Sequence, residues 1–200
     1  MTSNNTGRID NTQKEAIFIM SLDCEGKWGM ADQLTDNLCH ALTNEKLNTA
    51  YTNLIKILRT YQIKATFAFV GAFVMTIEEF HDRQDWFADV EIKGVSWLDE
   101  FRKATRLKQY DGWFNPKALD IVQSIATHEI ASHGFTHLLL DESLINKSDF
   151  LHEMNWMRQV MDLKGVRPQT LIYPRNLTGY SSELKDLGIK GYRDNLPSHS

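Results

Sequence analysis

The chain alternates short apolar runs with longer stretches in which apolar residues recur every three or four positions. The short runs have the length of strands and predict five of them, over residues 16–22, 65–70, 129–132, 170–173 and 189–193. The longer stretches predict four helices, over residues 44–61, 115–125, 148–161 and 182–187. Asn115 and Ser148 are expected to cap the second and third helices. Because strands and helices alternate, the pattern predicts an α/β fold built on parallel strands.

Residues 76–113 interrupt this alternation. They carry Trp86, Trp97 and Trp113 among many charges, with one helix expected over residues 96–105. Connections of this length are commonly binding loops or lids, although a variable insertion over one end of a barrel would look the same. Aromatic rings suit the faces of sugars as well as packing, so Trp113 is a candidate substrate contact.

Composition and charge narrow the class of protein. With 200 residues, 42% of them hydrophobic, the chain can bury one sizeable core, and a single domain is expected over residues 14–200. The net charge of -4 and the absence of a Lys/Arg run argue against a nucleic-acid partner. No apolar stretch approaches the roughly 20 residues of a membrane span.

The N-terminal residues and the number of cysteines indicate the cellular compartment of the protein. Residues 1–13 are polar, lack the basic-then-apolar order of a signal peptide and are expected to be disordered. Cys24 and Cys39 are the two cysteines, too few for a disulfide framework. Together these features indicate a cytoplasmic protein.

Candidate chemistry gathers at the ends of the predicted strands. Asp23 and Glu25 follow the first strand, and because a strand alternates its faces, both can point one way while Cys24 points elsewhere. His133 and His137 begin where the 129–132 strand stops. In parallel α/β folds reactive groups lie at the carboxyl ends of strands. Two imidazoles and a carboxylate suit a zinc-like ion with an open water position, so the sequence predicts a metal hydrolase site.

A third segment, Tyr173-Pro174-Arg175-Asn176, closes the 170–173 strand. Proline fixes the backbone there and exposes the next N–H groups. Arg175 could stabilise a base carboxylate or an oxyanion. Each segment also has a plain explanation, namely a cap or surface turn for the carboxylates, chance spacing for the histidines and a structural turn here.

In this order the three segments resemble the polysaccharide deacetylase (NodB-homology) family. The family's strand ending in Asp-x-Asp/Glu is matched by Asp23-Cys24-Glu25, and its His-Ser/Thr-x-x-His motif by residues 133–137. Residues 65–71, Ala-Thr-Phe-Ala-Phe-Val-Gly, are similar to its second strand. The third motif, usually Pro-Tyr-Gly, here reads Pro-Arg-Asn. That variant resembles a branch associated with bacterial surface-polysaccharide and O-antigen gene clusters.

The resemblance implies a distorted (β/α) barrel, incomplete in this chain because five strands cannot close it. It implies a divalent metal ion, most often zinc, with cobalt, nickel or iron as alternatives. The implied metal ligands are Glu25, His133 and His137. Asp23 would act as general base, and the backbone N–H of Arg175 would hold the oxyanion. The expected substrate contacts are Tyr173, Pro174, Asn176 and Trp113.

The implied activity is removal of an N-acetyl group from a sugar or glycan, with this chain as the N-terminal part of the domain. Cys24 stands where many members place the metal-binding aspartate, so Asp23 could replace Glu25 as the ligand. The family's late Leu-x-His motif, which supplies the general acid, is not visible, and His199 lies only a few residues past the last strand. Two alternatives remain, a cyclic-amide hydrolase of the allantoinase-like branch and a non-catalytic glycan-binding relative. The sequence does not set the oligomeric state.

Overall fold

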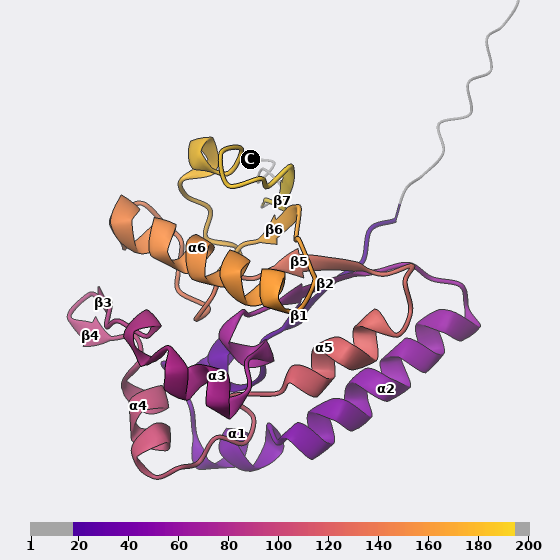
Figure 1. Cartoon of the computed structure of the whole chain (residues 1–200), viewed down its shortest axis with the longest axis horizontal. Helices are drawn as coiled ribbons and strands as arrows, with labels where there is room; N and C mark the ends of the chain where they lie inside the picture. Colours follow the sequence, from indigo (N-terminus) through magenta and orange to yellow (C-terminus); the bar gives the residue numbers. More distant parts are fainter. Residues whose placement is uncertain (1–17, 195–200) are drawn as a thin grey trace, which may run out of the picture.

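A computed structural model describes residues 18–194, so the expected disorder of residues 1–13 lies outside the described part. At its centre is a five-stranded parallel sheet in the order β1-β2-β5-β6-β7 (Figure 1). The strands are β1 (Ser21–Cys24), β2 (Thr66–Phe69), β5 (Glu129–Ser132), β6 (Thr170–Ile172) and β7 (Gly191–Arg193). All five predicted strands are therefore confirmed, each shorter than or equal to its apolar run.

The sheet curls into a half-barrel, which brings its two edge strands toward each other. Arg193 on β7 donates hydrogen bonds to Ser21 Oγ at 2.9 Å and to the carboxylate of Asp23 at 3.2 Å, both on β1. Strands in a sheet lie about 4.8 Å apart, so the edges of a flat five-stranded sheet would be roughly 19 Å apart, beyond the reach of one side chain. The incomplete α/β barrel is thus confirmed.

The two faces of the sheet carry different side chains. Phe67, Phe69 and Leu171 point to the outer face and are fully buried in the main core. The helices that share this core are α2 (Asn44–Thr60), α5 (Pro116–Gln123) and α6 (Lys147–Leu163). On the inner face, Ala68 and Ala131 form a separate small cluster with Ile172. Small inner residues leave room there for the long polar side chains at the strand ends.

Two helix caps differ from the prediction. Helix α6 begins at Lys147, and its cap is Asn146, whose side chain accepts from Asp149 N, and not Ser148. Asn115 precedes α5 as predicted, but its side-chain oxygen accepts no capping bond, while its amide nitrogen donates to Asn48 Oδ1. The predicted helix over 182–187 is a single 3-10 turn, η5 (Ser181–Glu183).

Residues 76–113 form a compact subregion beside the sheet. They contain α3 (Ile77–Asp82), the 3-10 turn η3 (Gln84–Trp86), the hairpin β3 (Glu91–Ile92) and β4 (Val95–Ser96), and α4 (Asp99–Arg106), the helix expected over 96–105. Several of their aromatic rings pack against the indole of Trp28, which precedes them in the chain, and against one another in edge-to-face and tilted contacts. The members of this aromatic cluster are Trp28, Phe80, Phe87, Phe101, Trp113 and Phe114.

Helix α1 (Asp36–Ala41), like α3, was not predicted, because six residues are too few to show a helical period. Among residues 18–194, none of the helices has both the length and the apolar character needed to cross a membrane.

Candidate metal centre

Two carboxylates leave β1 on the same side, as the alternation of a strand requires. Cys24, between them, is buried in the core beside Tyr51, and burial raises the pKa of its thiol. Asp23 and Glu25 instead face the carboxyl end of the sheet, where Glu25 begins the 3-10 helix η1 (Gly26–Met30). Cys24 therefore plays no part in this group of polar side chains.

Two imidazoles follow β5 and are almost fully buried. His133 is 0% exposed and His137 is 2% exposed, with ring centroids 4.9 Å apart. The chain between them turns sharply, since Gly134 has φ +77° and His137 itself has φ +60°. This backbone turn lets both rings face the same side.

These side chains meet at a single point. Glu25 Oε2 lies 3.2 Å from His133 Nε2 and 2.9 Å from His137 Nε2. One ligand atom from each of the three residues lies within 4.8 Å of the others. Burial alone would raise the pKa of Glu25, but hydrogen bonds to the two imidazoles hold it well below its usual range. Burial also lowers the pKa of His137, which favours its neutral, metal-binding form.

The hydrogen bond on the far side of His133 sets its tautomer. Nδ1 lies 2.7 Å from the carbonyl oxygen of Ile172, which can only accept, so Nδ1 carries the proton. Nε2 is then the ring nitrogen that faces Glu25 Oε2 at 3.2 Å, and a proton or a cation between these two atoms is needed to hold them so close. Backing of one ring nitrogen by a carbonyl is also the usual support of a metal-binding imidazole, so the donor set fits a divalent ion.

Asp23 belongs to a separate network centred on Arg193. The two guanidinium NH groups each donate to one oxygen of Asp23 at 3.2 Å, and Nε donates to Asn176 Oδ1 at 3.0 Å. Asp23 Oδ2 is 4.0 Å from His133 Nε2, so this carboxylate lies beside the imidazoles without joining them. Sequence reasoning did not identify Arg193, because its partner Asp23 is 170 positions away and no local motif surrounds it.

Arg175 does not contact Asp23. It pairs with both carboxylate oxygens of Asp32, from the loop after η1, and its guanidinium lies over the Trp97 ring at 5.6 Å from the centroid. Arg175 and Asn176 form the 3-10 turn η4 (Pro174–Asn176) and have left-handed φ angles of +52° and +54°. The Arg175 side chain was predicted to stabilise either a base carboxylate or an oxyanion; the side chain that contacts Asp23 is that of Arg193 instead.

Three of the four expected substrate contacts are buried. Trp113 is 1% exposed because its ring packs edge-on against Trp28 within the aromatic cluster. Tyr173 is 0% exposed and donates its hydroxyl to Gly179 O, and Pro174 is also buried. These residues shape the core under the turn, and Asn176 is the one partly exposed member of the set.

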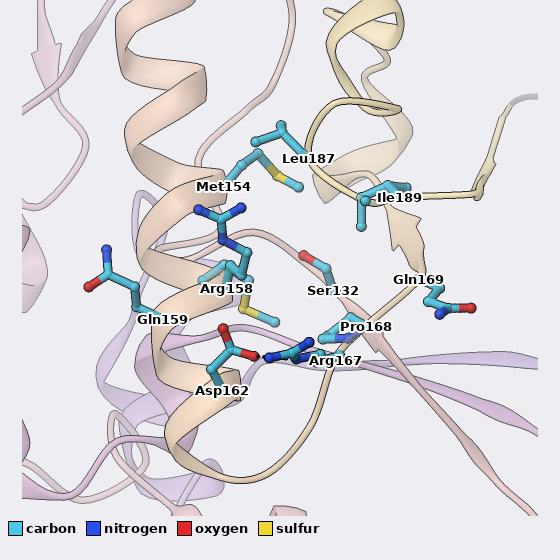
Figure 2. A pocket seen from close by; sticks show the side chains of 12 residues that line it. Ser132, Met154, Arg158, Gln159, Asp162, Arg167, Pro168, Gln169, Leu187 and Ile189 are labelled. Carbon is cyan, nitrogen blue, oxygen red and sulfur yellow. Dashed lines mark hydrogen bonds and ion pairs between the residues drawn. The ribbon is translucent and has the colours of Figure 1, made fainter.

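A cavity of about 530 Å³ lies elsewhere, between α6 and the turn before β7 (Figure 2). Figure 2 shows Met154 and Arg158 on the side of α6, Leu187 and Ile189 on the facing segment, and Ser132 between them. None of the three side chains of the metal cluster lines it. It is on the outer face of the sheet, separate from the candidate chemistry.

The model of one protein family matches this chain, described as polysaccharide deacetylase, over residues 35–192. The match includes both histidines and the turn at 174–176, but begins after Asp23 and Glu25. No curated protein sequence matches the chain significantly.

Several solved structures are similar in fold. The BpsB deacetylase domain of Bordetella bronchiseptica is 11% identical, with 90% of this chain and 64% of that one covered and a TM-score of 0.47. BA3943 of Bacillus anthracis, described as a CE4 family pseudoenzyme, is 12% identical, with 87% and 42% covered and a TM-score of 0.45. A family 4 carbohydrate esterase of Streptomyces lividans is 13% identical, with 86% and 59% covered and a TM-score of 0.43. The chain thus spans between 42% and 64% of the length of these proteins.

Proposed function

The chain belongs to the polysaccharide deacetylase family, and from this premise we propose that it is a metal-dependent hydrolase that removes the N-acetyl group from a sugar. The observation that carries the proposal is the meeting of Glu25, His133 and His137 at one buried point beside a second carboxylate, Asp23. A carboxylate next to a three-ligand metal site suits metal-assisted amide hydrolysis, because three side chains hold the ion while the second carboxylate accepts a proton.

Glu25, His133 and His137 would hold the metal, with zinc as the first choice and cobalt, nickel or iron as alternatives. A zinc ion in such a site supplies Lewis acidity and lowers the pKa of water toward neutrality. The geometry favours Glu25 over Asp23 as the ligand, because Glu25 Oε2 is within 3.2 Å of both Nε2 atoms whereas Asp23 Oδ2 is 4.0 Å from the nearer one.

Asp23 would act as the general base that accepts the proton of the attacking water. Its two oxygens are each held by one NH group of Arg193, which fixes the direction of their remaining lone pairs. Arg193 is in turn held by Ser21 and Asn176. Arg193 is accordingly a positioning residue for the base, and Asn176 acts through it as well as from the rim of the site.

Arg175 would contribute through its backbone. The turn η4 follows β6 beside the imidazoles, which supports a role for the Arg175 N–H in holding the oxyanion as the acetamide carbonyl is attacked. The Arg175 side chain, paired with Asp32 over Trp97, would border the entrance for the sugar.

We infer that the substrate is an N-acetylated sugar of a bacterial surface polysaccharide or its precursor, met in the cytoplasm. The Pro174-Arg175-Asn176 turn supports this assignment, because the same variant of the third motif characterises the branch that it resembles.

One observation favours a second candidate, a glycan-binding relative without turnover. No third imidazole joins the cluster among residues 18–194, so protonation of the leaving amine has no assigned donor there. His199 lies outside the described residues.

The test is acetate release from N-acetylated oligosaccharides by the purified protein, with metal content measured alongside. The proposal expects about one equivalent of bound metal, acetate release that a chelator abolishes and added zinc restores, and loss of both metal and activity in His133→Ala. The exposed His152→Ala serves as the control and should behave as wild type. Metal without turnover on any acetylated sugar would favour the glycan-binding candidate. Hydrolysis of a cyclic amide that no chelator affects, without acetate release from sugars, would favour a cyclic-amide hydrolase.

A further inference from the structure

The backbone of the turn between the two imidazoles is bound by several distant elements. The carbonyl of Gly134 accepts from Gly71 N at 2.9 Å, and that of Phe135 accepts from Ala72 N at 2.8 Å. Both donors belong to the segment that follows β2. The next carbonyl, that of Thr136, accepts from the indole N–H of Trp97 at 3.1 Å. The oxygen atoms of the turn are thus fixed from two sides.

The N–H groups of the same turn are bound by one side chain, Glu153 of α6. Its Oε2 accepts from Phe135 N and from Thr136 N, each at 2.8 Å, while Oε1 accepts from the Thr136 hydroxyl at 2.5 Å. Three donors therefore converge on one carboxylate. The contact is tight, because a Cβ atom on Gly134 would lie 3.3 Å from Glu153 Oε2.

Glu153 occupies a position where a carboxylate is costly. It is 6% exposed, and burial raises its pKa, against the donors from Thr136 and Phe135 that lower it. Its helical neighbours Met154, Met157 and Phe150 pack in the core, and an apolar residue at 153 would bury there without a desolvation penalty. A charged group in this place is explained by what it binds, which is the turn that carries the imidazoles.

Helix α6 has anchors of its own besides Glu153. Its last turn is held by the ion pair of Lys164 with Glu79 of α3 at 2.7 Å, and its first by the Asn146 cap. Its buried methionines join it to the core. The bonds of Glu153 therefore serve the turn more than the helix.

We propose that Glu153 is a positioning residue, which holds the 134–136 backbone so that His133 and His137 are set for metal binding before the ion arrives. This inference rests on the proposed function for its metal readout. Its consequence is that the metal-free protein already has the ligand geometry, so that binding the ion does not have to order the turn.

The experiment compares Glu153→Ala, Glu153→Gln and the matched control Glu79→Gln in the full chain. Glu79→Gln removes the charge of another glutamate that contacts α6, the partly buried partner of Lys164, but leaves the turn between the imidazoles intact. The readouts are the affinity for Zn²⁺ and Co²⁺ against a competing chelator, amide hydrogen exchange of Phe135 and Thr136 in the metal-free protein, and the thermal midpoint.

The proposal expects the metal affinity of Glu153→Ala to fall by about 10- to 100-fold, the range measured for lost support of metal ligands. Exchange at Phe135 and Thr136 should accelerate in the same variant. Glu153→Gln should lose less, because its amide oxygen can still accept from both N–H groups. Glu79→Gln should lower the thermal midpoint while the affinity and the exchange at these two amides stay as in wild type.

Equal metal affinity in Glu153→Ala and Glu79→Gln would overturn the proposal, as would unchanged exchange at the two amides. If Glu153→Ala does not fold, Thr136→Val takes its place, because it removes one of the three donors alone, and unchanged affinity and exchange in both Thr136→Val and Glu153→Gln would then overturn it. A wild-type protein that binds no metal would refute the proposed function, whereas the exchange comparison would still decide whether Glu153 holds the turn.

Discussion

The candidate site has two halves that are built in opposite ways. The imidazole half consists of Glu25, His133 and His137; its two rings are almost fully buried, and its turn is fixed by hydrogen bonds to its backbone. The arginine half consists of Asp23, Asn176 and Arg193, with Arg175 next to Asn176 in the turn; it is partly exposed, and the Arg193 side chain joins it by reaching from β7 to β1. One half has its geometry fixed by the core, while the other depends on contacts between surface side chains. We expect the first to control whether metal is bound and the second to control how fast a bound substrate reacts.

The sharpest test of this division replaces each of the two carboxylates, which lie two residues apart, by its amide in a separate variant. Glu25→Gln should reduce metal affinity by more than about 100-fold, since it removes a ligand and not merely the support of one. Asp23→Asn should keep the metal and lower the rate of acetate release by roughly 10²–10⁴-fold, the usual contribution of a general base. Metal analysis and initial rates on the same preparations check both, and the reverse pattern would make Asp23 the ligand.

Within the arginine half, Arg193→Lys should lower the rate by about 10- to 100-fold with the metal content unchanged. A lysine keeps the charge but cannot donate to both oxygens of Asp23 and to Asn176 at once, so the base loses its fixed direction. The measurement is kcat beside KM, and the exposed Arg158→Lys on α6 is the matched control. A rate equal to wild type would remove Arg193 from the site.

Within the imidazole half, Gly134→Ala should cost more stability than Gly188→Ala. Both glycines have positive φ, +77° and +81°, so each substitution carries roughly 1–2 kcal/mol of left-handed strain. Only Gly134 has Glu153 Oε2 within 3.3 Å of the added carbon, whereas nothing lies within 4 Å at Gly188. Urea unfolding of the two variants gives the difference, and equal losses would show that the turn has room to adjust.

The smallest effect concerns the exposed pair of Arg175 and Asp32. Burial alone would raise the pKa of Asp32, but hydrogen bonds from Arg175 hold it below its ordinary value of 3.8. A carboxyl with a depressed pKa stabilises the fold above its unfolded pKa and loses that contribution as the pH falls below 3.8. Arg175→Gln should therefore cost less than about 1 kcal/mol at pH 7, and the gap to wild type should close as the pH approaches 3.

Unfolding curves of wild type and Arg175→Gln between pH 3 and 7 measure this gap. The same curves in 1 M salt provide the control, because screening should shrink the difference at neutral pH. A gap that persists at pH 3 would mean that Arg175 acts through its stacking on Trp97 and not through its charge.

The sequence predicted the parts of the molecule whose cause is local. Helix α2 was found almost to the residue, because its apolar positions recur over 17 residues, and the strand ends that carry Asp23, Glu25 and both imidazoles were identified from their apolar runs. The six-residue helices were missed, since so short a segment shows no period.

What the sequence could not give are contacts between residues that lie far apart in the chain. Arg193 pairs with Asp23 because the two edge strands approach each other, and Glu153 reaches the histidine turn from a helix that looks, by its methionines, like simple core packing. Trp113 was expected at a sugar face from its type alone, but the neighbouring rings of the aromatic cluster enclose it. The sequence around a residue does not show which residue far away in the chain will contact it.

Successive side chains of β1 point to opposite faces of the sheet, and this alternation decides which of them can reach the site. Asp23 and Glu25 are odd-numbered neighbours of an even-numbered cysteine that is embedded in the hydrophobic layer. Deleting one residue between Met20 and Asp23 would turn each of these side chains to the opposite face of the sheet. Both acidic side chains would then be buried in the hydrophobic core, and the cysteine sulfur would face the histidines. A strand with two such different faces tolerates a changed side chain far better than a changed length. Natural variation in this strand should therefore consist of substitutions and almost never of insertions or deletions.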